Sequence, residues 1–90
     1  MFIKITSLQT LPDYILLVGF STGEFKKFDI KPLIAKYPPF KALQANGLYE
    51  QVKIDMDCYG VVWNDELDLS ANGLYEQGQP CKPSTNIKST

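Results

Sequence analysis

Histidine and arginine are both absent from this chain of 90 residues, and every basic side chain in it is a lysine. Histidine is the usual acid–base catalyst and metal ligand near neutral pH. Arginine is the usual bidentate clamp for phosphate and carboxylate groups, and it makes most base-specific contacts with DNA. Their absence removes most routes to catalysis and to sequence-specific binding of nucleic acid, so we expect a protein that is not an enzyme.

Cysteines and long apolar runs are also scarce. Cys58 and Cys81 are the two cysteines, and without a histidine to activate it neither has the character of a nucleophile. The longest unbroken apolar run is Tyr14–Val18, far shorter than the roughly 20 residues of a membrane-spanning helix. The N-terminus alternates at once and carries no signal-peptide pattern. We therefore expect a cytoplasmic protein with no membrane partner, in which both thiols are reduced.

The apolar content is sufficient for one small folded domain, because 44% of the residues are hydrophobic and 12% are aromatic. We expect the domain to span residues 1–79. Residues 80–90 are polar and contain two prolines and several serines and threonines, which predicts a flexible tail.

Three strands are predicted in the first half, at residues 2–9, 14–20 and 25–30. Turn residues separate them at 11–13 and 21–24. Residues 14–20 carry apolar side chains on both faces, which predicts the central strand of an antiparallel three-stranded meander.

A short helix follows the third strand. Asp29 is the expected N-cap, and Pro32 suits the first turn. The helix is expected to end at Tyr37, because Pro38 and Pro39 cannot continue it. A second short helical turn is predicted at residues 40–44.

A β-hairpin is predicted in the second half. Residues 52–56 alternate apolar and polar, residues 58–60 form a turn, and residues 61–63 return as the partner strand. Trp63 is expected to anchor the core.

An acidic loop is expected at residues 64–69. Ser70 is the expected cap of a short C-terminal helix at residues 71–77, and Gly78 is expected to end it. The predicted fold is therefore a small α+β domain with a meander, a short helix, a hairpin and a C-terminal helix.

One heptapeptide, Ala-Asn-Gly-Leu-Tyr-Glu-Gln, occurs twice, at residues 45–51 and 71–77. Two short copies do not make a solenoid. In one interpretation both copies supply a leucine and a tyrosine to the core. In the other, Tyr49 and Tyr75 are exposed as matched anchors for a partner.

Charge is unevenly distributed along the chain. Residues 1–44 carry six lysines and three carboxylates, whereas residues 45–80 carry one lysine and seven carboxylates. The excess of acid predicts either a solvated surface or a docking surface for a basic partner. The candidate interaction surface comprises Tyr49, Tyr75, Asp65, Glu66 and Asp68. The candidate basic patch comprises Lys26, Lys27, Lys31 and Lys36.

The spacing of Asp55, Asp57, Gly60 and Glu66 is close to that of a calcium-binding EF-hand loop. Tyr59 occupies a position that requires an oxygen ligand, and the flanking residues predict strands rather than helices. A hairpin turn explains the same residues, so we expect no metal site and no cofactor.

An ordered set of short motifs extends over most of the chain. The motifs are Val18-x-Phe20, Gly23, Phe28-Asp29-Ile30, Leu33-Ile34, Phe40-x-x-Leu43, Tyr49-x-x-Val52-x-Ile54-Asp55, Gly60-Val61-Val62-Trp63, Asp68-Leu69-Ser70 and Leu74-Tyr75. Over residues 2–78 the set resembles the bacterial family called domain of unknown function 2442 (DUF2442). The resemblance implies a small α+β fold and supplies no catalytic residues. Some members of the family resemble the first half of proteins with a helix-turn-helix, and others resemble small partners in toxin–antitoxin pairs.

Two hypotheses about function follow. The first is a non-enzymatic protein-interaction module, expected to self-associate as a homodimer, that regulates or neutralises a partner protein in the manner of an antitoxin. The alternative is a nucleic-acid-associated transcriptional regulator that uses the lysine patch.

Overall fold

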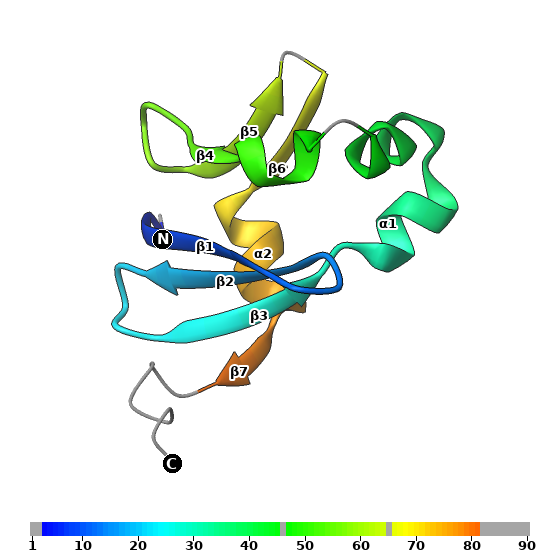
Figure 1. The fold of residues 1–90 in the computed structure, drawn as a ribbon. Helices are drawn as coiled ribbons and strands as arrows, with labels where there is room; N and C mark the ends of the chain where they lie inside the picture. Colours follow the sequence, from blue (N-terminus) through cyan, green and yellow to red (C-terminus); the bar gives the residue numbers. More distant parts are fainter. Residues whose placement is uncertain (1–2, 46, 65, 82–90) are drawn as a thin grey trace.

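Short strands and short helices make up the computed structural model, which describes residues 3–45, 47–64 and 66–81. The elements are β1 (Ile5–Leu11), β2 (Ile15–Phe20), β3 (Phe25–Asp29), α1 (Lys31–Lys36), the 3₁₀ helices η1 (Pro38–Gln44) and η2 (Leu48–Gln51), β4 (Lys53–Ile54), β5 (Gly60–Asn64), β6 (Leu67–Ser70), α2 (Ala71–Gln77) and β7 (Gln79–Cys81). The strands form two antiparallel sheets, ordered β1-β2-β3-β7 and β4-β5-β6 (Figure 1). The predicted α+β class is confirmed.

The predicted central strand of the meander is β2. It pairs with β1 on one side and with β3 on the other. Leu16, Val18 and Phe20 are buried on one face, whereas Ile15 and Leu17 are half-buried on the other. In the hairpin between β2 and β3, Gly23 has φ +94°, a conformation that costs glycine little.

Helix α1 ends where the sequence predicts but begins differently. Ile30, with φ −82° and ψ −17°, occupies the N-cap position, so the assignment of Asp29 as N-cap is wrong by one residue. The Asp29 carboxylate still helps the first turn, because its Oδ1 accepts the backbone N–H of Lys31 at 2.9 Å. Tyr37 is extended because a proline follows it, and η1 then begins at Pro38.

The predicted hairpin in the second half is present, but its first strand is shorter than expected. Only Lys53 and Ile54 pair with β5. The chain turns at Asp55, whose carbonyl accepts the N–H of Cys58 at 2.9 Å. Met56 therefore lies in the turn and is 96% exposed, which contradicts its predicted place in the strand.

The predicted acidic loop at residues 64–69 is wrong, because Leu67–Ser70 form strand β6 beside β5. Asn64 Oδ1 accepts the backbone N–H groups of Glu66 and Leu67, at 2.8 and 3.0 Å, and so stabilises a tight turn. Leu67 is buried and Leu69 half-buried, while Asp68 between them is exposed. The two leucines thus show the alternation of a strand, but the acidic residues around them favour the prediction of a loop.

Helix α2 forms as predicted. Ser70 Oγ accepts the Gly73 N–H at 3.0 Å, and Gly78 follows the last helical residue. A Cβ on Gly78 would lie 2.7 Å from the Leu74 carbonyl oxygen and 3.0 Å from Lys26 Cβ. Glycine therefore allows the chain to pass closely between α2 and β3.

Strand β7 adds to the predicted meander, since Gln79 pairs with Lys27 and Cys81 with Phe25. Pro80 and Cys81 therefore belong to the sheet rather than to the predicted tail. The rest of that tail, residues 82–90, lies outside the described residues. No helix in the described part of the chain is long and apolar enough to cross a membrane.

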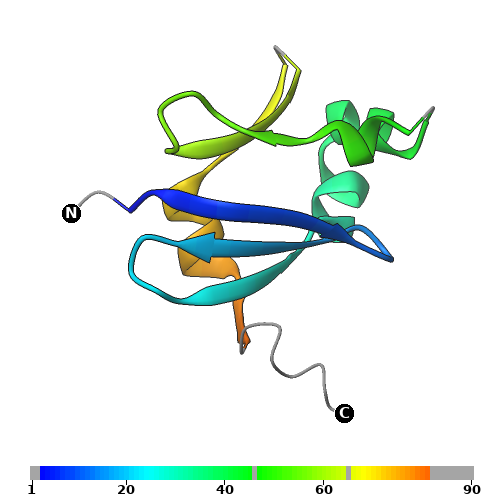
Figure 2. The same ribbon diagram turned by 60° about the vertical axis from the view of Figure 1, so that its left-hand side comes forward.

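The core lies between the two sheets, on the face of the first sheet that α2 covers (Figures 1 and 2). Trp63 is its predicted anchor and is 5% exposed. One backbone hydrogen bond joins β1 of the first sheet to the β4–β5 loop, from Ile5 N–H to the Cys58 carbonyl, and a second joins α2 to the same loop, from Ala71 N–H to the Tyr59 carbonyl; each is 2.7 Å long.

Gly60→Ala tests how closely β5 and β6 approach. A Cβ at this position would lie 2.6 Å from the Leu69 carbonyl oxygen, so one strand must shift. We expect the free energy of unfolding in urea to fall by about 1–3 kcal/mol. Asp57→Ala, at an exposed position of the same hairpin, is the control and is expected to change it by less than about 0.5 kcal/mol. Equal unfolding midpoints for the two variants would contradict the close approach.

Candidate functional site

The structure divides the predicted lysine patch. Lys26 and Lys27 are neighbours on β3, so their side chains point to opposite faces of the sheet. Lys26 Nζ donates to the Tyr75 carbonyl and lies 3.7 Å from the centre of the Tyr75 ring. Lys27 is exposed on the face away from α2. These two lysines therefore do not form one surface.

Lys31 and Lys36 lie at the two ends of α1, and η1 adds Lys41, which the predicted patch did not include. All three are exposed. Residues 31–44, which we call the lysine segment, contain these three lysines and no aspartate or glutamate. The absence of acid over this run is the signal that identifies Lys41.

A hollow of about 400 Å³ lies against the lysine segment. It is lined by Tyr14, Lys31, Ile34, Ala35, Lys41 and Gln44. The hollow thus brings two lysines that are ten positions apart in the sequence to the same place, beside a tyrosine.

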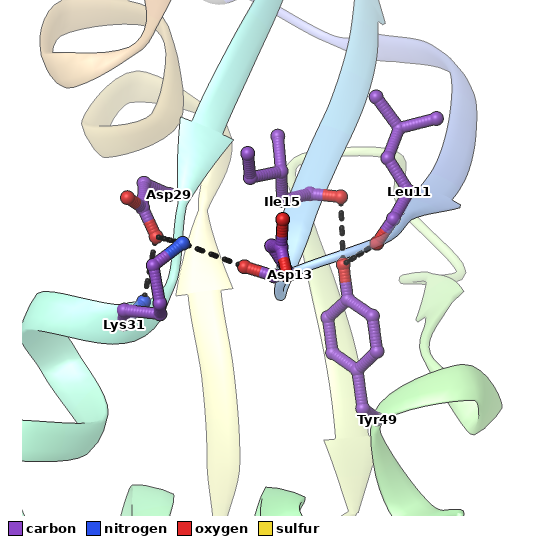
Figure 3. Close-up of polar contacts among 6 residues, drawn as sticks. All are labelled: Leu11, Asp13, Ile15, Asp29, Lys31 and Tyr49. Carbon is purple, nitrogen blue, oxygen red and sulfur yellow. Dashed lines mark hydrogen bonds and ion pairs between the residues drawn. The ribbon is translucent and has the colours of Figure 1, made fainter.

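Lys31 is held in place by two contacts (Figure 3). Its Nζ lies 3.1 Å from Asp29 Oδ1 and donates to the Asp13 carbonyl at 2.7 Å. The lysine segment is thereby fixed to the turn between β1 and β2. Lys36 and Lys41 make no ion pair with any residue that the structure describes, so their charges are available to an external anion.

Tyr49 supports the same turn. Its hydroxyl donates to the Ile15 carbonyl at 2.6 Å and lies 3.3 Å from the Leu11 carbonyl (Figure 3). Its ring packs edge-on against Tyr14, with centroids 4.9 Å apart. Asp13 and Tyr14 both have positive φ, at 66° and 60°, a conformation that needs such support in residues other than glycine.

Tyr49 is only 4% exposed, so it does not lie on the predicted interaction surface. Burial disfavours the phenolate and raises the pKa of Tyr49 to about 12. Its role in the described structure is to hold the β1–β2 turn.

Tyr75 lies at the other end of β2. Its ring packs edge-on against Phe20, with centroids 5.2 Å apart, and its hydroxyl donates to Glu24 Oε1. This hydrogen bond lowers the pKa of Glu24 and raises the pKa of Tyr75. Tyr49 and Tyr75 therefore contact opposite ends of one strand and do not form a matched pair.

The acidic members of the candidate interaction surface lie around the second sheet. Glu66 is in the turn before β6 and Asp68 is exposed on that strand, while Asp65 lies outside the described residues. Asp55 and Asp57 lie in the loop at the other end of β5. Within the described residues, no three potential metal ligands come together.

Tyr49→Phe tests the support of the β1–β2 turn. The variant removes the hydroxyl that donates to Ile15, so the free energy of unfolding in urea is expected to fall by about 1 kcal/mol below pH 10. Between pH 10 and about 12 the unfolded tyrosine loses its proton while the buried one keeps it. The stability of the unmodified protein therefore falls as pH rises through this range, by a total of about 2–3 kcal/mol from this group.

Tyr49→Phe lacks this loss, so its disadvantage should shrink and then reverse as pH approaches 12. Parallel pH profiles for the two proteins would contradict the burial of the Tyr49 hydroxyl.

Comparison with solved structures finds the same fold in a protein from Nitrosomonas europaea ATCC 19718, which is described as a "Putative DNA Binding Protein". The TM-score is 0.73 and the sequence identity 24%. The match covers 86% of this chain and 49% of that one, so this chain spans about half the length of its structural neighbour. A comparison with curated proteins finds no match.

The family described as "Protein of unknown function (DUF2442)" matches residues 5–80, which confirms the resemblance seen in the sequence motifs. The match extends from the first residue of β1 into β7 and includes both sheets and the lysine segment. The chain belongs to the DUF2442 family.

Proposed function

We propose that this domain is a nucleic-acid-associated regulatory module that contacts backbone phosphates through the lysine segment. The observation that carries the proposal is the presence of three exposed lysines, and no carboxylate, on residues 31–44. A polyanion is attracted by such a run, whereas the acidic second half of the chain repels it. The proposal includes no catalytic role.

The position of the lysine segment favours contact with an extended ligand. Helix α1 and the 3₁₀ helix after it lie to one side of the two sheets (Figure 1). Lys36 and Lys41 are available there, while Asp29 partly neutralises Lys31. Two to three phosphate contacts are therefore within reach of this segment.

Contacts of this kind carry no sequence information. Lysine binds phosphate as a point charge, and the chain has no arginine for bidentate contacts with guanine. The domain would add affinity and position, while another domain or protein reads the bases. The description of the Nitrosomonas protein, which is about twice as long, as DNA-binding agrees with such a division of labour.

The proposal is tested by measuring the affinity for duplex DNA over a range of salt concentrations. Each phosphate contact contributes about −0.9 to the slope of log K against log salt. We expect a slope of about −2 to −3 for the unmodified protein, and a slope closer to zero by about 2 for the double variant Lys36→Gln/Lys41→Gln.

Lys53→Gln is the matched control, because Lys53 is an exposed lysine on β4 in the second sheet. It should leave the slope unchanged. Absence of binding at low salt, or equal slopes for all three proteins, would rule out the lysine segment as a phosphate-binding surface.

Binding to a regulated partner protein is a second candidate function. It is favoured by the β4–β5 hairpin, where Met56 is 96% exposed between the exposed residues Asp55 and Asp57. An exposed methionine suits a contact with another protein, because its flexible side chain adapts to the partner's surface. The flanking acids would select a partner with a basic rim.

Affinity capture from the native host should then recover a protein in stoichiometric amount, and Met56→Ser should abolish its recovery. Glu76→Ser, at an exposed position on α2, is the control and should retain it. Recovery that is insensitive to Met56→Ser would exclude the hairpin as the docking site.

A further inference from the structure

The first sheet has one face that no described element covers. Its other face packs against α2, where Phe20 contacts the Tyr75 ring and Lys26 donates to the Tyr75 carbonyl. In both ribbon views α2 lies behind β2 and β3, and no helix and no strand of the second sheet is drawn in front of them (Figures 1 and 2). We call the uncovered side the outer face.

The outer face is apolar at its centre. Strand alternation and register place five half-buried apolar residues there: Leu11, Ile15, Leu17, Phe25 and Cys81. None of them belongs to the core or to the side chains packed against it. These side chains therefore cover the sheet without a described layer above them.

Two details fix the shape of this face. Leu17 is flanked by Gln9 and Lys27 on the neighbouring strands, which places it in the middle. The Phe25 ring lies across Gly19, where an added Cβ would meet ring carbon Cε2 at 2.9 Å. The Phe25 ring therefore fills the space over Gly19, and a hollow lined in part by Ile15, Lys27, Asp29 and Gln79 adjoins the face on the β3 side.

The charges on the outer face are one cation and one anion, two positions apart on β3. The Lys27 side chain is exposed and forms no hydrogen bond or ion pair with any described residue. Asp29 makes both of its contacts with Lys31 through Oδ1, which leaves Oδ2 without a partner in the described structure. A face with balanced charge attracts neither a phosphate polymer nor an anionic membrane surface.

We propose that the outer face is a self-complementary interface that binds a second copy of this chain. The two-fold axis lies between the first sheets of the two copies and runs across the strands at the level of Phe28. It therefore exchanges the positions of Lys27 and Asp29. Each Lys27 then lies opposite the partner's Asp29. The same axis places Leu17 opposite Ile15 of the other copy, because these residues pair with Lys27 and Asp29 within the sheet.

The resulting assembly is two sheets packed face to face, about 10 Å apart, with apolar side chains between them. Five apolar residues from each copy are few compared with the roughly 20–30 residues a side of a stable interface. The dimer is therefore weak and depends on concentration in the micromolar to millimolar range.

Sedimentation of the full chain tests the interface. The unmodified protein should shift from monomer to dimer as its concentration rises, and Leu17→Lys should remain monomeric throughout. Val62→Lys is the matched control, because Val62 is a half-buried valine on β5, outside this face, and the variant should dimerise normally. Circular dichroism confirms that each variant is folded.

A charge exchange tests the register and does not depend on the Leu17 variant folding. Lys27→Glu alone and Asp29→Lys alone should each be monomeric, because like charges then face each other across the axis. An equimolar mixture of the two should dimerise. In the mixed pair the introduced glutamate faces the introduced lysine, and the unchanged Asp29 of one copy faces the unchanged Lys27 of the other, so both contacts are attractive.

An unmodified protein that stays monomeric at millimolar concentration would overturn the proposal. A dimer that persists in Leu17→Lys would also overturn it, as would a mixture of the charge variants that stays monomeric. None of these outcomes bears on the lysine segment, whose test measures DNA affinity.

Discussion

The hydrogen bonds of Tyr49 connect the parts of this small domain. Its hydroxyl binds the Ile15 and Leu11 carbonyls at the end of the first sheet. Its own carbonyl accepts the Trp63 indole N–H from the second sheet at 3.1 Å. One residue in a four-residue 3₁₀ helix therefore joins the two sheets and also holds the turn that contacts Lys31. Tyr14, which lines the hollow beside the lysine segment, packs against the Tyr49 ring.

The repeated heptapeptide shows that local sequence is not enough to choose a conformation. In the first copy Gly47 has φ +71° and Leu48–Gln51 form a 3₁₀ helix. In the second copy all seven residues are α-helical, because Ser70 caps them. Tyr49 is almost fully buried in the first copy, whereas Ala71 and Leu74 are almost fully buried in the second. The two copies therefore have the same sequence and both contribute to the core, but they do not form a common surface.

The sequence predicts most of this fold because apolar alternation and turn residues agree over the first 30 positions. The prediction from sequence fails where one sequence pattern conceals another. The acids around Leu67 and Leu69 hide strand β6, and the alternation up to Met56 hides a turn that a left-handed Cys58, φ 64°, makes possible.

The candidate site is predicted less well than the fold. Lys26 and Lys27 are adjacent in sequence but point to opposite faces, and only tertiary contacts bring Lys31 and Lys41 to one hollow.

The two proposed surfaces are compatible because they occupy different parts of the molecule. The lysine segment begins two residues after Asp29, at one end of β3, whereas the outer face extends across the four strands. A two-fold axis across the strands exchanges the ends of the sheet, so the two lysine segments of a dimer lie at opposite ends. A short oligonucleotide then contacts one segment, and only a longer one engages both. Self-association would therefore make the affinity for nucleic acid depend on its length, although each contact is weak and independent of sequence. The reason is that, once one lysine segment of the dimer is bound, binding of the other segment to the same strand is intramolecular.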